Sequence, residues 1–168
     1  LLFGEEQLEF RAFGVSSSNF TRGHRFHNNI EIVIDKPTQY EKVLREVGHI
    51  IPNFEKRKDL IRAEVLEQGS LANAIAVIDE ELLDEVTSLV EYPIALTGEF
   101  DSEFLKVPPE ALILAMKSHQ KCFHMNDAEG NLLPKFITVS NIRSKDPLQV
   151  VKGNELSLIH ISEPTRLA

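Results

Sequence analysis

The stretch from Phe104 to Glu155 constrains the fold more than any other part of this chain. Pro109 suits the first turn of a helix, where the backbone N–H needs no partner, and the apolar run 111–116 predicts a helix that is buried on several sides. Two strand-like segments within 121–141 then flank a polar turn, in which Gly130 can take a positive φ. The stretch therefore predicts a buried helix followed by a β-hairpin.

Further strands and helices are predicted before this stretch. Alternating apolar residues predict strands at 8–12 and 30–34 separated by a polar turn at 14–19, and a short apolar strand is expected at 94–97. Helical spacing predicts three helices, at 38–47, 52–68 and 79–90. The first has a Thr38/Glu41 capping box, the second is expected to end at Gly69, and Asp79 caps the third. Another helix is expected from Asp146. The predicted fold class is α+β (mixed α/β), with strands and a hairpin packed against several amphipathic helices.

Length, charge and cysteine content restrict the possible functions. The chain has 168 residues and no initiator Met, and we expect it to be part of a longer protein. Its net charge of -8 argues against a general polyanion binder, so any RNA contact must be local. Cys122 is the single cysteine, which favours a reducing compartment, and no secretion signal or membrane-spanning run occurs in the sequence. We expect a cytoplasmic protein with no membrane contact.

Two basic segments are candidates for contact with an anion. In the first, Arg22, His24 and Arg25 surround Gly23, where a backbone can approach another group closely. Two interpretations are open for this loop: it faces an anion, or its basic residues tie it to nearby carboxylates. The second segment is the run 56–58, for which a solvated helix face is favoured over contact with a nucleic-acid backbone, because the same helix carries several carboxylates.

Histidines near the single cysteine raise the question of a metal or a nucleophile. His119, Cys122 and His124 lie within six residues, and His24 and His27 form a second pair. A structural zinc site normally has four thiolate or imidazole ligands, so one cysteine makes a metal site the weaker interpretation. A nucleophilic thiol needs a nearby base and a lowered pKa, which proximity in sequence does not establish. We predict a buried thiol and no metal.

Several ordered motifs carry a resemblance to a known family. They are TRGHRF at 21–26, SLVEYPIAL at 88–96, and then FLKVPPEAL, MKSHQKCF, LLPKFITVSN and VVKGNE between Phe104 and Glu155. In this order and spacing they resemble the β subunit of bacterial glycyl-tRNA synthetase, over about nine tenths of the chain, from near residue 8 to Glu155. Residues 156–168 lack the family pattern, and we predict a non-native tail there.

The resemblance implies a function and its partners. It implies part of the β subunit of an α2β2 glycine–tRNA ligase, with the α subunit and tRNA-Gly as partners. ATP with Mg²⁺ would be bound by the α subunit, and no cofactor, metal or catalytic residue is expected here, since the sequence has no glycine-rich phosphate loop or class II synthetase motif. The candidate tRNA or anion contacts are Arg22, His24, Arg25, Lys117, His119 and Lys121.

The resemblance also implies a fold and leaves alternatives open. The covered region is expected to be similar to the B3/B4-type module of phenylalanyl-tRNA synthetase, although no editing-site residue of that module is matched. One alternative function is a structural module that docks onto the α subunit or another β-subunit domain. Another is a hydrolytic, editing-like domain that uses His24, His27, His119 and Cys122.

Overall fold

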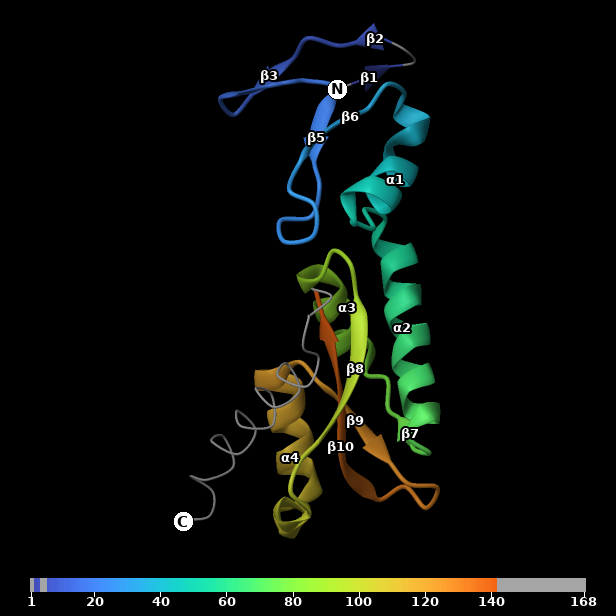
Figure 1. Ribbon diagram of the computed structural model, residues 1–168. Helices are drawn as coiled ribbons and strands as arrows, with labels where there is room; N and C mark the ends of the chain where they lie inside the picture. The colour runs from blue at the N-terminus through green and yellow to red at the C-terminus, as the bar shows by residue number, and fades with distance from the viewer. Residues whose placement is uncertain (1, 4–5, 142–168) are drawn as a thin grey trace. The chain divides into compact units, whose positions relative to one another are not determined.

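The structure is a computed structural model that describes residues 2–3 and 6–141. The chain divides into two compact units, Leu1–Arg57 and Lys58–Ala168, and each is described by itself (Figure 1). The described residues combine short antiparallel strands with helices, so the predicted α+β class is confirmed. Among them, no helix is both long and apolar enough to cross a membrane. The helix expected from Asp146 and the tail 156–168 lie outside the described residues.

Short hairpins make up much of the first unit. The strands pair antiparallel in sequence order, and they are β1 (Leu2–Phe3) with β2 (Glu6–Gln7), β3 (Arg11–Ala12) with β4 (Val15–Ser16), and β5 (Phe20–Arg22) with β6 (Glu31–Val33). The strand expected at 8–12 is shorter than predicted, and the turn predicted at 14–19 was wrong. The chain reverses at Phe13 and Gly14, whose φ values of 49° and 80° suit a two-residue hairpin turn.

The first helical segment starts differently from its prediction. A 3₁₀ turn (Pro37–Gln39) leads into α1 (Tyr40–Val43) and a π-helical turn (Leu44–Gly48). The predicted capping box was wrong, because the proline already occupies the first turn and no side chain caps the N–H groups there. Within this unit Ile32, Ile34 and Leu44 form the buried apolar positions.

The long helix α2 (Phe54–Leu71) is capped by Asn53, whose Oδ1 accepts a hydrogen bond from Lys56 N at 3.0 Å. Its buried residues include Ile61 and Val65, as predicted. The predicted end at Gly69 was wrong, because this glycine lies inside the helix against Ala76, where a Cβ atom would come within 2.9 Å of the alanine Cβ. Gly69 therefore allows a close approach of strand and helix rather than ending the helix.

A four-stranded antiparallel sheet organises the second unit. Its strand order is β7-β9-β10-β8, and the strands are β7 (Ile75–Ala76), β8 (Ile94–Glu99), β9 (Phe123–Asn126) and β10 (Leu132–Ser140). The predicted hairpin is confirmed, with Gly130 at a φ of 89° in the turn between β9 and β10. Strand β8 is an edge strand, and Glu64 of α2 accepts a hydrogen bond from its Ala95 N at 2.9 Å.

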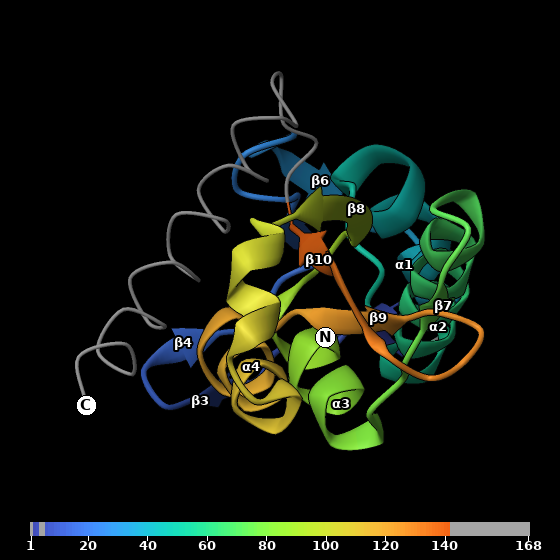
Figure 2. The same cartoon turned by 90° about the horizontal axis from the view of Figure 1, so that it is seen from below.

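Alternation along the strands divides the core of this unit between the two sheet faces. Ile137 of β10 packs with buried residues of α2 and α3 (Glu80–Leu89), whereas its neighbour Phe136 packs with Leu112 and Met116 on the α4 side. Helix α4 (Pro109–Ala115) and α2 accordingly lie on opposite sides of β9 and β10 (Figure 1, Figure 2).

Helices α3 and α4 begin where the sequence predicts. The Asp79 cap of α3 is confirmed, since its Oδ1 accepts a hydrogen bond from Leu82 N at 3.0 Å. Helix α4 begins at Pro109, as predicted, and continues into a π-helical turn (Met116–Gln120). The prediction that this helix is buried on several sides was wrong. Leu112 is buried but Leu114 is 62% exposed, because the sheet covers only one face of the helix.

Candidate functional site

The best candidate site is the connection between β5 and β6, which consists of Arg22 at the end of β5 and the loop 23–30. We call residues 22–30 the arginine loop. Gly23 N donates a hydrogen bond to Ile30 O at 3.2 Å and closes the base of the loop, and Asn28 N donates to His24 O at 2.9 Å. A Cβ atom on Gly23 would overlap the Asn28 carbonyl oxygen and lie 3.2 Å from Gly48 Cα. The tight path of this loop therefore depends on glycine at this position.

His24 holds the arginine loop from inside. Its side chain is 1% exposed, and its backbone N–H donates to Gly48 O at 2.6 Å. The ring Nδ1 accepts hydrogen bonds from the backbone N–H groups of Phe26 at 3.2 Å and His27 at 3.3 Å. A ring nitrogen that accepts hydrogen bonds carries no proton itself. By accepting from two successive backbone N–H groups, Nδ1 organises the turn. His24, predicted as a candidate anion contact, is thus placed inside the unit.

The two arginines of the loop lie on its surface. Arg22 is exposed at the end of β5, opposite Glu31 in the strand register. Arg25 is also exposed, and its guanidinium carbon lies 5.5 Å from the centre of the Phe26 ring, a cation–π contact. Within residues 2–3 and 6–141, neither arginine forms an ion pair. Of the two interpretations of this loop, the described contacts favour the one in which the arginines face outward.

The basic run 56–58 has protein partners. Lys56 Nζ pairs with Glu41 at 2.5 Å, and Arg57 donates a hydrogen bond to the Ile51 carbonyl oxygen. Lys58, whose side chain is only 17% exposed, pairs with Asp84 at 2.5 Å. These residues tie α2 to neighbouring segments, so the run is not simply the solvated face that its carboxylate neighbours suggested.

The three candidate contacts near the start of β9 lie in the second unit. Lys117 pairs with Asp79 at 2.8 Å and with Glu81 at 2.9 Å, and Lys121 pairs with Glu85 at 2.7 Å. Hydrogen bonding to Asp79 raises the pKa of Lys117, and the same contact lowers the pKa of Asp79. His119 is exposed. Both lysines therefore have anionic partners on or beside α3.

Helix α3 contributes an acidic row that sequence reasoning did not assign. Two further acidic residues of this helix bind cations of α2. Glu80 accepts hydrogen bonds from Arg62 at 2.5 and 2.8 Å, and Asp84 pairs with Lys58. Hydrogen bonding to Arg62 lowers the pKa of Glu80 to about 2. The spacing of Glu80 with Asp84, and of Glu81 with Glu85, is the sequence signal that could have revealed two acidic stripes facing two sets of cations.

Cys122 is a buried thiol, as predicted. It packs with Leu112, Met116 and Phe136, and its Sγ donates to Gln120 O at 3.3 Å. Burial raises the pKa of the thiol to about 12. Almost no thiolate exists at neutral pH under these conditions, so Cys122 is poorly suited to act as a nucleophile. In the described part of the chain, no three His, Cys, Asp or Glu side chains are grouped as metal ligands.

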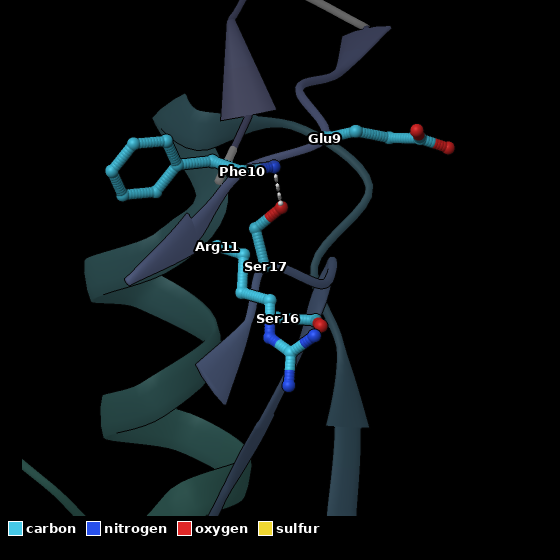
Figure 3. A pocket seen from close by; sticks show the side chains of 5 residues that line it. All are labelled: Glu9, Phe10, Arg11, Ser16 and Ser17. Carbon is cyan, nitrogen blue, oxygen red and sulfur yellow. Dashed lines mark hydrogen bonds between the residues drawn. The ribbon is translucent and has the colours of Figure 1, made fainter. Parts of the chain in front are cut away.

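A shallow hollow of about 440 Å³ lies on the hairpin β3–β4. It is lined by Glu9, Phe10, Arg11, Ser16 and Ser17 (Figure 3). Ser17 Oγ accepts a hydrogen bond from Phe10 N at 2.8 Å and donates to Leu8 O at 2.5 Å, which closes the hairpin. None of the lining side chains is buried, so the hollow is an open surface feature.

Comparison with known proteins identifies the family. Residues 1–159 match the family described as glycyl-tRNA synthetase beta subunit. The glycine–tRNA ligase beta subunit of Hahella chejuensis is 51% identical over 155 residues, and that of Marinobacter nauticus is 49% identical over 156 residues. The corresponding protein of Coxiella burnetii is 46% identical over 155 residues.

Each of these alignments covers 92% of this chain and 22% of the relative, so the chain spans about a fifth of the length of the relatives it matches. The match extends through residue 159, beyond the boundary at Glu155 that the motifs suggested. The chain belongs to the glycyl-tRNA synthetase beta subunit family.

Proposed function

We propose that this segment works as part of the β subunit of a glycine–tRNA ligase, in the ATP-dependent attachment of glycine to tRNA-Gly. Its membership of the family and the names of its relatives support this assignment. In this proposal the segment acts in the cytoplasm on the tRNA side of the reaction. The α subunit of an α2β2 assembly activates glycine with ATP and Mg²⁺.

The observation that carries the tRNA role is the arginine loop. Arg22 and Arg25 are exposed, and they form no ion pair with any residue that the structure describes. The backbone of their loop is fixed by the buried His24 and by the close approach at Gly23, so little ordering of the backbone is needed when the arginines meet a phosphate. Lys117 and Lys121 are weaker candidates, because contact with RNA would compete with their carboxylate partners.

A docking module is the second candidate function, and it is favoured by the charge of the second unit. Residues 58–168 contain ten basic and 18 acidic residues. Such a surplus of carboxylates disfavours RNA and suits a basic partner surface, for example on the α subunit. The hydrolytic alternative is less well supported, because its proposed thiol, Cys122, is buried with a pKa of about 12.

Kinetics of the complete ligase test the tRNA role. Arg22→Ala/Arg25→Ala should raise the KM for tRNA and leave glycine-dependent ATP–pyrophosphate exchange unchanged, because exchange needs no tRNA. Arg45→Ala is the matched control: this arginine is also exposed in the first unit, but it pairs with Glu46 at 3.5 Å. An unchanged KM for tRNA together with a lower melting temperature would reject the tRNA role and make the two arginines structural.

A further inference from the structure

Residues 10–30 form a stretch without any carboxylate, bounded by Glu9 and Glu31. It contains the three arginines 11, 22 and 25, and the four phenylalanines 10, 13, 20 and 26. The charge of the whole chain conceals this feature. Residues 1–57 carry eight basic and eight acidic residues, so the net charge of -8 arises entirely in the second unit. A polyanion can therefore approach this stretch without the repulsion that the overall charge suggests.

The aromatic rings of this stretch point away from the core. Phe10 is 61% exposed, Phe13 106%, Phe20 51% and Phe26 65%. The three arginines are exposed as well. Single exposed apolar residues are common, but here four exposed rings and three exposed arginines are interleaved within 21 residues of sequence. This combination of side chains suits a ligand with both flat apolar faces and negative charge.

We propose that the arginine loop is a stacking platform for an unpaired nucleotide of RNA. The nucleobase stacks on the Phe26 ring, and the phosphates on either side of it face Arg22 and Arg25. This inference rests on the proposed tRNA role and deepens it, because it specifies unpaired nucleotides as the part of the RNA that this loop contacts. No sequence preference is implied, since every base has a π face.

The geometry of the loop supports this assignment. The Arg25 guanidinium already lies 5.5 Å from the centre of the Phe26 ring, so the aromatic face and the positive charge are adjacent. The backbone N–H of Phe26 is fixed by its hydrogen bond to the buried His24 ring, which limits the motion of the residue that carries the ring. A base inside a duplex is already stacked on both of its neighbours, so it cannot use this ring, whereas an unpaired nucleotide can.

The charges distinguish RNA from an apolar protein partner. An apolar protein surface would leave the two loop arginines to be desolvated without a counter-charge, which is unfavourable. An RNA strand supplies a phosphate for each arginine and a base for the ring. Arg22 has Glu31 opposite it in the register, yet no salt bridge joins them in the described residues, so its guanidinium is available to a phosphate.

The experiment compares two substitutions of Phe26 in the complete ligase. Phe26→Leu keeps an apolar side chain but removes the aromatic face, whereas Phe26→Trp enlarges that face. Binding of a tRNA-Gly transcript at fixed salt should weaken roughly fivefold or more for Phe26→Leu and should stay within about twofold of wild type for Phe26→Trp. Leu114→Ala removes a comparably exposed apolar side chain, 62% exposed on α4, and should change nothing.

A fully paired RNA duplex serves as the second probe. Wild type and Phe26→Leu should bind it equally, because it offers no unpaired base. Equal tRNA binding by wild type and Phe26→Leu would overturn the inference. Weaker association of the ligase subunits in Phe26→Leu, with tRNA affinity unchanged, would also overturn it and would mark a protein-docking surface. If Arg22→Ala/Arg25→Ala impairs charging while Phe26→Leu does not, this inference fails and the proposed function stands.

Discussion

Substitution of Gly23 by alanine should open the arginine loop without unfolding the rest of the chain. The new Cβ would overlap the Asn28 carbonyl oxygen and lie 3.2 Å from both Cα and O of Gly48. All of these neighbours are backbone atoms, which cannot rotate away as a side chain can. Overpacking costs about 1–3 kcal/mol, and we expect the upper part of this range, about 2–3 kcal/mol, because the obstacle is rigid.

Amide hydrogen exchange measures this cost locally. The His24 N–H donates to Gly48 O at 2.6 Å, and this bond must break when the loop opens. A loss of about 2–3 kcal/mol corresponds to roughly 30- to 150-fold faster exchange of that amide. Gly14→Ala is the control, because Gly14 has a φ of 80° but no atom within 4 Å of its Cβ position. It should strain its own turn and leave the His24 amide unchanged. Exchange within about twofold of wild type for Gly23→Ala would refute the steric argument.

Other predictions concern the second unit. The Cys122 thiol, with a pKa of about 12 against the usual 9.0, should react with iodoacetamide at pH 8 at least a hundredfold more slowly in the folded than in the unfolded chain. Because unfolding lowers this pKa, the free energy of unfolding should decrease as the pH rises above about 9; a flat profile would contradict burial of the thiol. The Glu80 carboxyl should titrate near pH 2 by NMR, and its midpoint should shift toward 4.5 in Arg62→Met. The stability that this pairing contributes should be lost as the pH falls from about 4.5 toward 2. A midpoint that Arg62→Met leaves unchanged would exclude the pairing. Gly98→Ala would place a Cβ against the Phe136 ring and should destabilise the unit by about 2–3 kcal/mol in chemical denaturation, whereas a Phe136→Leu background should reduce that cost.

Local sequence signals predicted much of the second unit. The Asp79 cap, the Pro109 helix start and the Gly130 hairpin all depend on interactions within a few residues, which the sequence displays directly. Signals that depend on distant contacts failed. The sequence pattern predicts a helix end at Gly69, whereas the structure uses its lack of a side chain for packing against Ala76.

The candidate site was predicted in outline. The sequence marked residues 21–26 by their arginines and glycine, but the burial of His24 follows from contacts with Gly48, 24 positions away. Likewise, the sequence presents Lys117 and Lys121 as free cations, and only the position of α3 beside them reveals their carboxylate partners. The similarity to the B3/B4-type module of phenylalanyl-tRNA synthetase stays a prediction.

The salt dependence of tRNA binding tests the central claim most directly. Removing one arginine that faces a phosphate should reduce the slope of log K against log salt by roughly 0.7–0.9. For the complete ligase, Arg22→Ala/Arg25→Ala should therefore reduce the slope by about 1.5, whereas Arg45→Ala should leave it unchanged. A double variant that is folded and binds tRNA with the wild-type slope would contradict the claim that the arginine loop faces RNA.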